Sequence, residues 1–361
     1  MADLKDIASR FMIAGTPLEV TPYGSGLIND TFMVRTDRAL PRYVLQRIND
    51  SIFKDVDLLQ DNIMKVTSHI REKLLMRGES DIERKVLHFI PCEDTGKTYF
   101  FDGESYWRIS VLIEGGHSHE TVDGKHSYFA GKSFGEFESM LSDLEEPLGE
   151  TIPDFHNMEL RLRQLDQAVL HNPVGRMGEK EVAGILEEIS LYADSMCQAE
   201  KLHRSGVLPK RVCHCDTKVN NMLFDDQGDV LCVIDLDTVM PSYVFSDFGD
   251  FLRTAANTGA EDEKDLSKVS FNMDIFRCFT KGYIEGTKDF LLPIEKECLP
   301  YAACLFPYMQ AVRFFADYIN GDTYYKILYP EHNLVRTKAQ MKLFHSAMDH
   351  VPQMKEFISL L

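Results

Sequence analysis

The side chains best suited to chemistry lie within residues 212–224 and just beyond them. Asp216 is a carboxylate that could accept a proton, and Asn221, five residues later, offers an amide oxygen from the same tight loop. Asp235 ends an apolar run that follows a hairpin turn predicted at 225–228. Carboxylate and amide oxygens are the hard ligands that Mg²⁺ prefers. The spacing therefore predicts a general base and a magnesium site, built from one loop and the hairpin after it.

The order of His214, Asp216 and Asn221 follows the pattern H-x-D-x-x-x-x-N, which is typical of phosphoryl-transfer loops. We expect Asp216 to orient an attacking hydroxyl and to accept its proton, while Asn221 and Asp235 hold Mg²⁺ against ATP oxygens. Lys218 could stabilise the transferring phosphoryl group, or it is an ordinary surface lysine. The ring of His214 is expected to pack behind the loop.

Two further carboxylates compete for the metal role. Asp247 begins the signature Asp-Phe-Gly, but it lies thirty-one residues after Asp216 and no apolar strand precedes it. We therefore assign the metal to Asp235 and expect Asp247 to order the loop through hydrogen bonds, which a buried carboxylate needs. Asp237 could bind metal, contact a substrate hydroxyl or have a structural role.

A glycine-rich turn upstream predicts a flap over phosphate groups. Gly24 and Gly26 let backbone N–H groups approach an anion closely, and Asn29 and Thr31 add side-chain donors. An ordinary hairpin is the alternative reading of two glycines alone.

The elements that would position these residues change character at Gly115-Gly116. Before this hinge, strand patterns with one helix indicate a small, mostly antiparallel lobe; after it, helical patterns dominate. The chain thus predicts an α+β fold with two lobes, a small β-rich one at 1–114 and a larger helical one at 115–361. The backbone near Leu112 to Glu114 would then face an adenine ring. The expected strands are 18–21, 23–34, 42–48, 85–90, 98–101 and 106–113, and the expected helices are 3–15, 55–76, 126–144, 157–170, 179–204 and much of 267–361.

Composition narrows the partners. The chain has 361 residues, 44% hydrophobic and 27% charged, with a formal net charge of −18. Such an acidic protein is not expected to bind nucleic acid or an anionic membrane. The N-terminus does not resemble a signal peptide, no apolar stretch approaches the ~20 residues of a membrane span, and the eight cysteines include no C-x-x-C pair. These features favour a cytoplasmic protein with free thiols.

The loop, flap and second carboxylate together resemble the aminoglycoside phosphotransferase and choline kinase family. The resemblance implies a protein-kinase-like bilobal fold for this chain. The chain is most similar to a bacterial branch, the N-acetylhexosamine 1-kinases. Two of the matching stretches lie outside the chemistry that the wider family shares. The matches are Tyr23-Gly-Ser-Gly-Leu-Ile-Asn, Asp216-Thr-Lys-Val-Asn-Asn, Ile234-Asp-Leu-Asp-Thr-Val-Met-Pro, Asp262-Glu-Lys-Asp-Leu-Ser-Lys-Val and Tyr329-Pro-Glu-His-Asn-Leu-Val-Arg-Thr.

The resemblance implies ATP and Mg²⁺ as cofactors and a small sugar as acceptor, phosphorylated at the anomeric hydroxyl of N-acetylglucosamine or N-acetylgalactosamine. It implies that Asp216, Asp235, Arg313 and Tyr324 line the acceptor site. A buried arginine needs a polar or anionic partner, and for Arg313 the non-functional alternative is a structural carboxylate such as Asp317 or Asp322. A monomer or a small homo-oligomer is expected.

The chain departs from the branch at two positions. Leu27 replaces a histidine that would reach the sugar, and Gln46 stands on the third strand where a lysine commonly pairs with ATP phosphates. Phosphate binding would then depend more on the flap, on Gln46 and on the metal. The alternatives are a kinase of another alcohol, such as choline, an amino alcohol or an aminoglycoside, and a non-catalytic, pseudokinase-like binding protein. Arg313 disfavours a cationic substrate.

Overall fold

A computed structural model of the chain describes residues 3–24, 28–119 and 121–361. The chain divides into two compact units, and each is described by itself. The sheet unit comprises Met1–Ser118, Asp143–Pro153 and Met222–Met240; the helical unit comprises His119–Ser142, Asp154–Asn221 and Pro241–Leu361. The division at 114 and 115 stays a prediction, and the sheet unit gains two segments from later in the chain.

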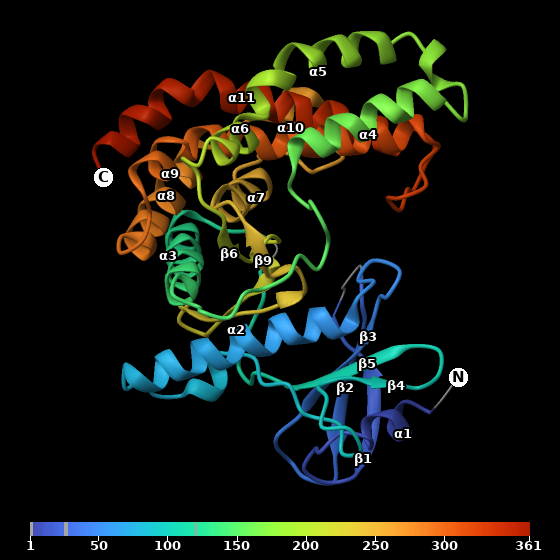
Figure 1. Cartoon of the computed structure of the whole chain (residues 1–361), viewed down its shortest axis with the longest axis vertical. Helices are drawn as coiled ribbons and strands as arrows, with labels where there is room; N and C mark the ends of the chain where they lie inside the picture. The colour runs from blue at the N-terminus through green and yellow to red at the C-terminus, as the bar shows by residue number, and fades with distance from the viewer. Residues whose placement is uncertain (1–2, 25–27, 120) are drawn as a thin grey trace. The chain divides into compact units, whose positions relative to one another are not determined.

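The sheet unit is built on a five-stranded antiparallel sheet in the order β1-β2-β3-β5-β4 (Figure 1). Alternation along β3 buries Tyr43 and Leu45, and these residues join Val34, Trp107 and Ile109 in one apolar core. The strands are β1 Pro17–Pro22, β2 Asp30–Thr36, β3 Tyr43–Ile48, β4 Phe100–Phe101 and β5 Tyr106–Val111. The helices are α1 Leu4–Ala8, α2 Val56–Met76 and the 3₁₀ turn η1 Ile82–Arg84.

The strand predicted at 85–90 is wrong. Only a single bridge forms there, between Phe89 and Ser110, while β4 pairs with β5 further along at Tyr106 and Trp107. The helix expected at 3–15 is shorter than predicted, whereas the helix at 55–76 is confirmed by α2, which begins after its N-cap Asp55.

A second hairpin belongs to the sheet unit. It pairs β7 (Met222–Phe224) with β8 (Val230–Val233), and Asp225 closes the predicted turn by accepting hydrogen bonds from the N–H groups of Gln227 and Asp229. The 3₁₀ turn η4 (Leu236–Thr238) follows directly.

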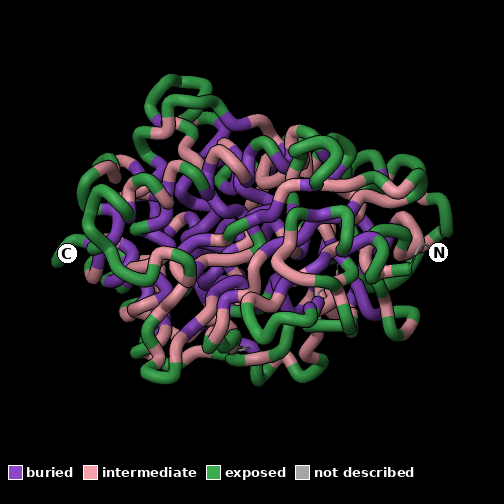
Figure 2. The backbone as a smooth tube through the Cα atoms, turned by 90° about the horizontal axis from the view of Figure 1, so that it is seen from below, coloured by how far each residue is buried: buried purple, intermediate pink, exposed green. Residues whose placement is uncertain are grey.

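Helices make up most of the second unit, which also pairs the short strand β6 with β9. Figure 2 shows exposed residues, in green, on the outside of the chain and buried residues, in purple, in its interior. The expected helix 179–204 is divided at Cys197 into α5 and α6. The elements are α3 Gly124–Leu141, α4 Met158–His171, η2 Arg176–Gly178, α5 Val182–Met196, α6 Gln198–Arg204, β6 Arg211–Cys213, η3 Val219–Asn221, β9 Met240–Ser242, α7 Phe245–Ala255, η5 Leu266–Lys268, α8 Met273–Thr287, α9 Pro293–Glu297, α10 Leu299–Ile319 and α11 His332–Ser359.

Glycines bring α3 and α8 into close contact. A Cβ atom added at Gly131 would lie 2.2 Å from the carbonyl oxygen of Phe279, and one added at Gly282 would lie 2.0 Å from that of Tyr128. Neither position has room for a side chain, because backbone atoms of the facing helix fill the space.

The helix α10 forms the centre of the helical unit. Its aromatic residues Phe306, Tyr308, Phe314, Phe315 and Tyr318 are buried. No helix among the described residues has the length and apolar character needed to cross a membrane.

Candidate active site

The loop between β6 and β7 brings together three of the predicted residues. The amide nitrogen of Asn221 donates to a carboxylate oxygen of Asp216 at 2.9 Å and to the Asp216 carbonyl at 2.7 Å. The ammonium group of Lys218 lies 2.7 Å from the other carboxylate oxygen. Because Asn221 uses its nitrogen here, its amide oxygen is the end that can bind a cation.

Lys218 is a cation in this setting. Burial by itself would lower its pKa, but the carboxylates of Asp216 and Asp250 outweigh that effect, and the pKa is raised above the ordinary lysine value. A charged ammonium group next to the predicted base suits it to stabilising a phosphoryl group. That role stays a prediction.

Asp247, at the start of α7, holds the loop from behind. Its fully buried carboxylate accepts hydrogen bonds from the N–H groups of His214 (2.8 Å) and Cys215 (2.7 Å), and its carbonyl accepts from the hydroxyl of Thr217 at 2.7 Å. Cys215 is thereby held at a φ of 63°, which a side chain other than glycine rarely adopts. The expectation that Asp247 orders this loop through hydrogen bonds is confirmed.

His214 packs as predicted. Its ring is buried against Phe134 and Phe137, with ring centroids 5.8 and 5.9 Å away, and its Nδ1 accepts the N–H of Asp216 at 3.3 Å. The imidazole therefore supports the backbone of the predicted base.

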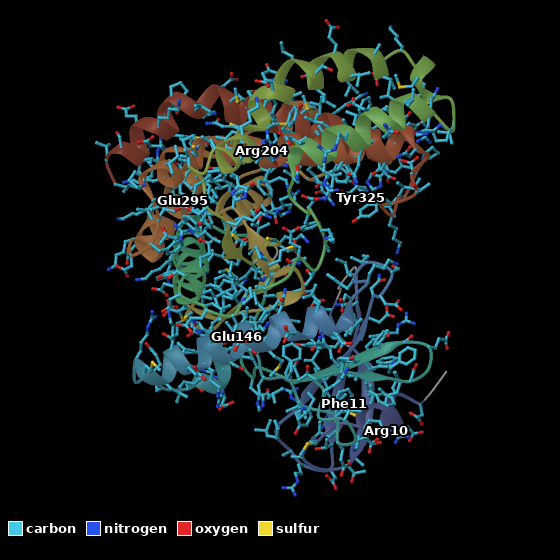
Figure 3. All side chains as sticks on the ribbon, in the orientation of Figure 1. Arg10, Phe11, Glu146, Arg204, Glu295 and Tyr325 are labelled. Atoms are coloured by element: carbon cyan, nitrogen blue, oxygen red, sulfur yellow. The ribbon has the colours of Figure 1, made fainter. Side chains whose placement is uncertain are left out.

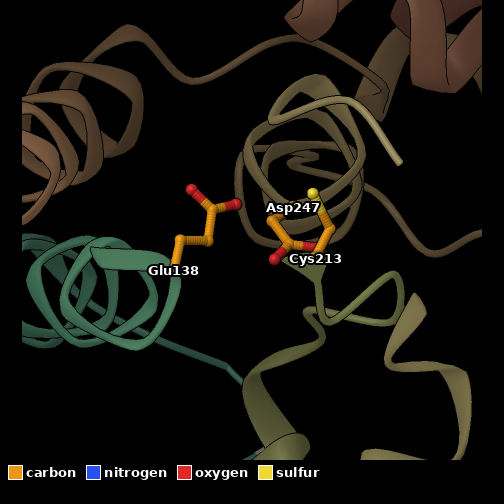
Figure 4. A group of neighbouring side chains, drawn as sticks. All are labelled: Glu138, Cys213 and Asp247. Carbon is orange, nitrogen blue, oxygen red and sulfur yellow. The ribbon is translucent and has the colours of Figure 1, made fainter. Parts of the chain in front are cut away.

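Asp247 also belongs to a buried cluster with Glu138 and Cys213 (Figure 4), whose ligand atoms all lie within 4.8 Å of one another. Tyr283 donates to Glu138 at 2.6 Å, and Cys213 donates to the carbonyl of Tyr243 at 3.3 Å. Burial, together with the nearby Asp247 carboxylate, raises the pKa of Glu138 well above its usual range. Burial and Asp247 both favour the neutral form of Glu138, so this pair of buried carboxyl groups is suited to sharing a proton.

In the sheet unit, Asp235 comes after β8 and has φ 61° and ψ 59°. This left-handed conformation is uncommon for aspartate and costs roughly 1–3 kcal/mol, so the surrounding structure must enforce it. Such strain is often found at functional positions. Asp216 and Asn221 belong to the other unit, so a metal ion shared between them and Asp235 stays a prediction.

Asp237, two residues further along the chain, is buried and paired with other side chains. Arg108 forms an ion pair with it at 2.5 Å, and the amide of Asn29 donates to its other carboxylate oxygen at 2.7 Å. Among the three roles open to Asp237, these contacts favour the structural one.

The side chains predicted to contact phosphate form hydrogen bonds within the sheet unit. Gln46 donates to the hydroxyl of Thr31 at 3.3 Å and accepts from Nε of Arg108 at 2.9 Å, and Asn29 accepts the N–H of Asn49 at 2.9 Å. Their contact with a nucleotide stays a prediction.

The remaining nucleotide positions are placed as follows. Gly24 has a positive φ of 76°, which explains the glycine, while Gly26 and Leu27 lie outside the described residues. The carboxylate of Glu114 is ion-paired with Arg42, and its carbonyl accepts from Arg84 at 3.1 Å. The adenine contact of this segment is untested.

On the acceptor side, Arg313 projects from α10. Its guanidinium lies 5.4 Å from the ring centroid of Phe155 and 5.6 Å from that of Tyr325, which is labelled in Figure 3, and it donates to the amide oxygen of Gln310 at 3.1 Å. Within the described ranges it forms no ion pair with a carboxylate. Tyr324 is 64% exposed.

The structural carboxylates considered as partners of Arg313 are engaged elsewhere. Asp317 accepts the N–H groups of Thr323, Tyr324 and Tyr325 at 2.8–3.0 Å, and Asp322 pairs with Arg176 at 2.6 Å. Asp317 thus fixes the segment that carries both tyrosines, and the ion-pair alternative for Arg313 is wrong.

Sequence reasoning missed Arg108, His156 and Arg161. Burial first, and then the charges of Arg313 and Arg161, lower the pKa of His156 well below its usual range, whereas Asp216 opposes the shift. Burial and Arg313 lower the pKa of Arg161 to about 10. The only signal for Arg108 was a charge within an otherwise apolar strand.

Comparison with known proteins identifies the family and the fold. Residues 19–269 match the model of the phosphotransferase enzyme family. An aminoglycoside phosphotransferase from Alicyclobacillus acidocaldarius superposes with a TM-score of 0.65 at 13% identity, covering 99% of this chain and 96% of that one. A choline kinase from Cryptosporidium parvum gives 0.55 at 15% identity, covering 93% and 90%. A spectinomycin phosphotransferase solved with ADP and spectinomycin gives 0.53 at 15% identity, covering 99% and 98%. The predicted kinase-like fold is confirmed.

Proposed function

Because the chain belongs to the phosphotransferase enzyme family, we propose that it transfers the terminal phosphoryl group of ATP to the anomeric hydroxyl of an N-acetylhexosamine. Phosphotransfer to an alcohol follows from the family, whereas the sugar and the position of attack are the proposal. The observation that carries it is the Asp216 carboxylate, fixed by Asn221 and Lys218 in the same unit as Arg313.

In the proposed reaction the sugar oxygen forms a bond to the γ-phosphorus while the bond to the β-phosphate oxygen breaks. Asp216 orients the hydroxyl and takes its proton late, because the transition state is loose and little negative charge builds on the nucleophile early. Lys218 offers positive charge to the phosphoryl oxygens. Asn221 and Asp235, both hard oxygen ligands, would hold Mg²⁺, which neutralises phosphate charge when bound.

The charge near Arg313 supports an acceptor without an amine. Arg161 and Arg313 act together on His156, whose ring is therefore uncharged, and Asp216 acts on the same ring. Two guanidinium groups in one neighbourhood repel an ammonium group and suit a carbonyl or hydroxyl oxygen. An acetamido sugar offers both, whereas choline and aminoglycosides are cationic.

The test is ADP release by the purified protein with ATP and Mg²⁺, using N-acetylglucosamine, N-acetylgalactosamine, glucosamine, choline and an aminoglycoside as acceptors. We expect the two acetamido sugars to give the highest kcat/KM and the product to be a sugar 1-phosphate by ³¹P and ¹H NMR. Preference for an amine would refute the acceptor assignment. Nucleotide binding without turnover on any acceptor would instead favour a binding protein.

A further inference from the structure

A buried arginine in the sheet unit has no part in the chemistry described so far. Arg108, in the middle of β5, is 2% exposed and is among the largest fully buried side chains of the protein. Its guanidinium lies against Asp237 at 2.5 Å, donates to Gln46 at 2.9 Å and stacks 5.5 Å from the ring centroid of Phe89. Removing a guanidinium from water is costly unless its charge and its donors are matched.

The contacts of Arg108 join segments far apart in the sequence. Through Gln46, directly opposite in the register of β3 and β5, it reaches Thr31 on β2. Through Asp237 it reaches Asn29, which in turn accepts the N–H of Asn49 at 2.9 Å. The start of β2, the strand β3 and the turn η4 are therefore connected by one cation.

Arg108 also reduces the negative charge around η4. Asp235 and Asp237 are two residues apart, and a buried carboxylate without a partner would disfavour a second negative charge beside it. The ion pair with Arg108 balances the charge of Asp237. The hydroxyl of Thr151 also donates a hydrogen bond to the Asp237 carbonyl at 2.9 Å, which fixes the turn further. Asp235 can then keep its left-handed conformation as the predicted metal ligand of this turn.

We propose that Arg108 is a positioning residue for nucleotide binding. Its guanidinium anchors Asp237, and through that anchor it sets the turn that carries Asp235 and the residues that follow the glycine-rich turn. The inference rests on the proposed ATP-dependent function. The inference extends that function because it assigns to Arg108 an effect on nucleotide binding without any contact to the substrate.

The test measures MgADP affinity by calorimetry and the KM values for ATP and for the acceptor. We expect Arg108→Met to weaken MgADP binding and to raise the KM for ATP by about tenfold or more, because it leaves Asp237 buried without a cation. The KM for the acceptor should stay within about twofold, because Arg313 and the loop around Asp216 belong to the other unit. In Arg108→Met/Asp237→Leu, which removes both charges, MgADP affinity should recover in part.

Two variants serve as controls. Lys73→Met breaks the ion pair with Asp143, which lies in the same unit but outside this network, and should leave both KM values unchanged. Should Arg108→Met fail to fold, Asp237→Asn breaks the same ion pair while keeping the shape of the side chain, and a smaller loss of MgADP affinity is expected. A folded variant, Arg108→Met or in its absence Asp237→Asn, that binds MgADP like the wild type would overturn the inference and leave the proposed function intact. A wild-type protein that binds no nucleotide would overturn both.

Discussion

Asp237 and Asp247 are both buried carboxylates that hold a loop next to a predicted functional carboxylate, but they are stabilised in different ways. Asp237 is matched by the side chains of Arg108 and Asn29. Asp247 is matched by the backbone N–H groups of the very loop it supports and by a neighbouring acid. The first depends on a charge brought from another strand, and the second on local backbone geometry and on a proton.

Because of this difference, the two units should respond differently to mutation and to pH. Loss of the cation beside Asp237 leaves a buried carboxylate without its ionic partner, which is strongly destabilising. The cluster around Asp247 depends on Glu138 remaining protonated, so it is sensitive to rising pH.

The largest effect is expected at Asp216, whose loop is held in place by Asp247. Asp216→Asn should lower kcat by about 10²–10⁴-fold, because an amide cannot accept the hydroxyl proton. The KM for ATP should change little. Steady-state kinetics with Asp226→Asn, an exposed position in the hairpin turn, as the control would show this. A variant that keeps most of the wild-type rate would mean that Asp216 is not the base.

A second large effect is expected at Asp235, which lies just before the turn that contains Asp237. Asp235→Ala should remove the Mg²⁺ dependence of nucleotide binding, because a hard anionic ligand is lost. Calorimetric titration with ADP in the presence and absence of Mg²⁺ measures it. Unchanged Mg²⁺-dependent affinity would transfer the metal role to another carboxylate.

The proton in the Asp247 cluster predicts an effect on stability against pH. The pKa of Glu138 is raised by burial and by Asp247, so the folded state binds a proton that the unfolded state releases near the ordinary value of 4.5. The free energy of unfolding should therefore fall as the pH rises from there toward the raised pKa. In Glu138→Gln, whose amide can still donate to Asp247, this decline should be smaller in urea unfolding series. An equal decline in both proteins would contradict the shared proton.

The smallest effect is expected at Asp317, another carboxylate that accepts hydrogen bonds from the backbone. Asp317, like Asp247, accepts several backbone N–H groups, here those of residues 323–325. Asp317→Asn should loosen this segment and raise the KM for the acceptor by roughly three- to tenfold with little change in the KM for ATP. Equal changes in both KM values would show that the segment does not serve the acceptor specifically.

The contrast between the two carboxylates also explains what the sequence could predict. The loop around Asp216, its support by Asp247 and the hairpin turn follow from short-range spacing and turn chemistry, so they were predicted correctly. The pairing of Arg108 with Asp237 joins residues more than a hundred positions apart, and no local pattern encodes it. For the same reason, the return of 143–153 and 222–240 to the sheet unit was not anticipated.

The helix contact at Gly131 and Gly282 reaches further than packing alone. α3 carries Glu138 and α8 carries Tyr283, so the spacing of these two helices sets how the acid meets its phenol donor and Asp247. A methyl group at position 282 would push the helices apart and misalign the acid. A substitution at either glycine is therefore expected to lower activity without changing any atom of the loop around Asp216.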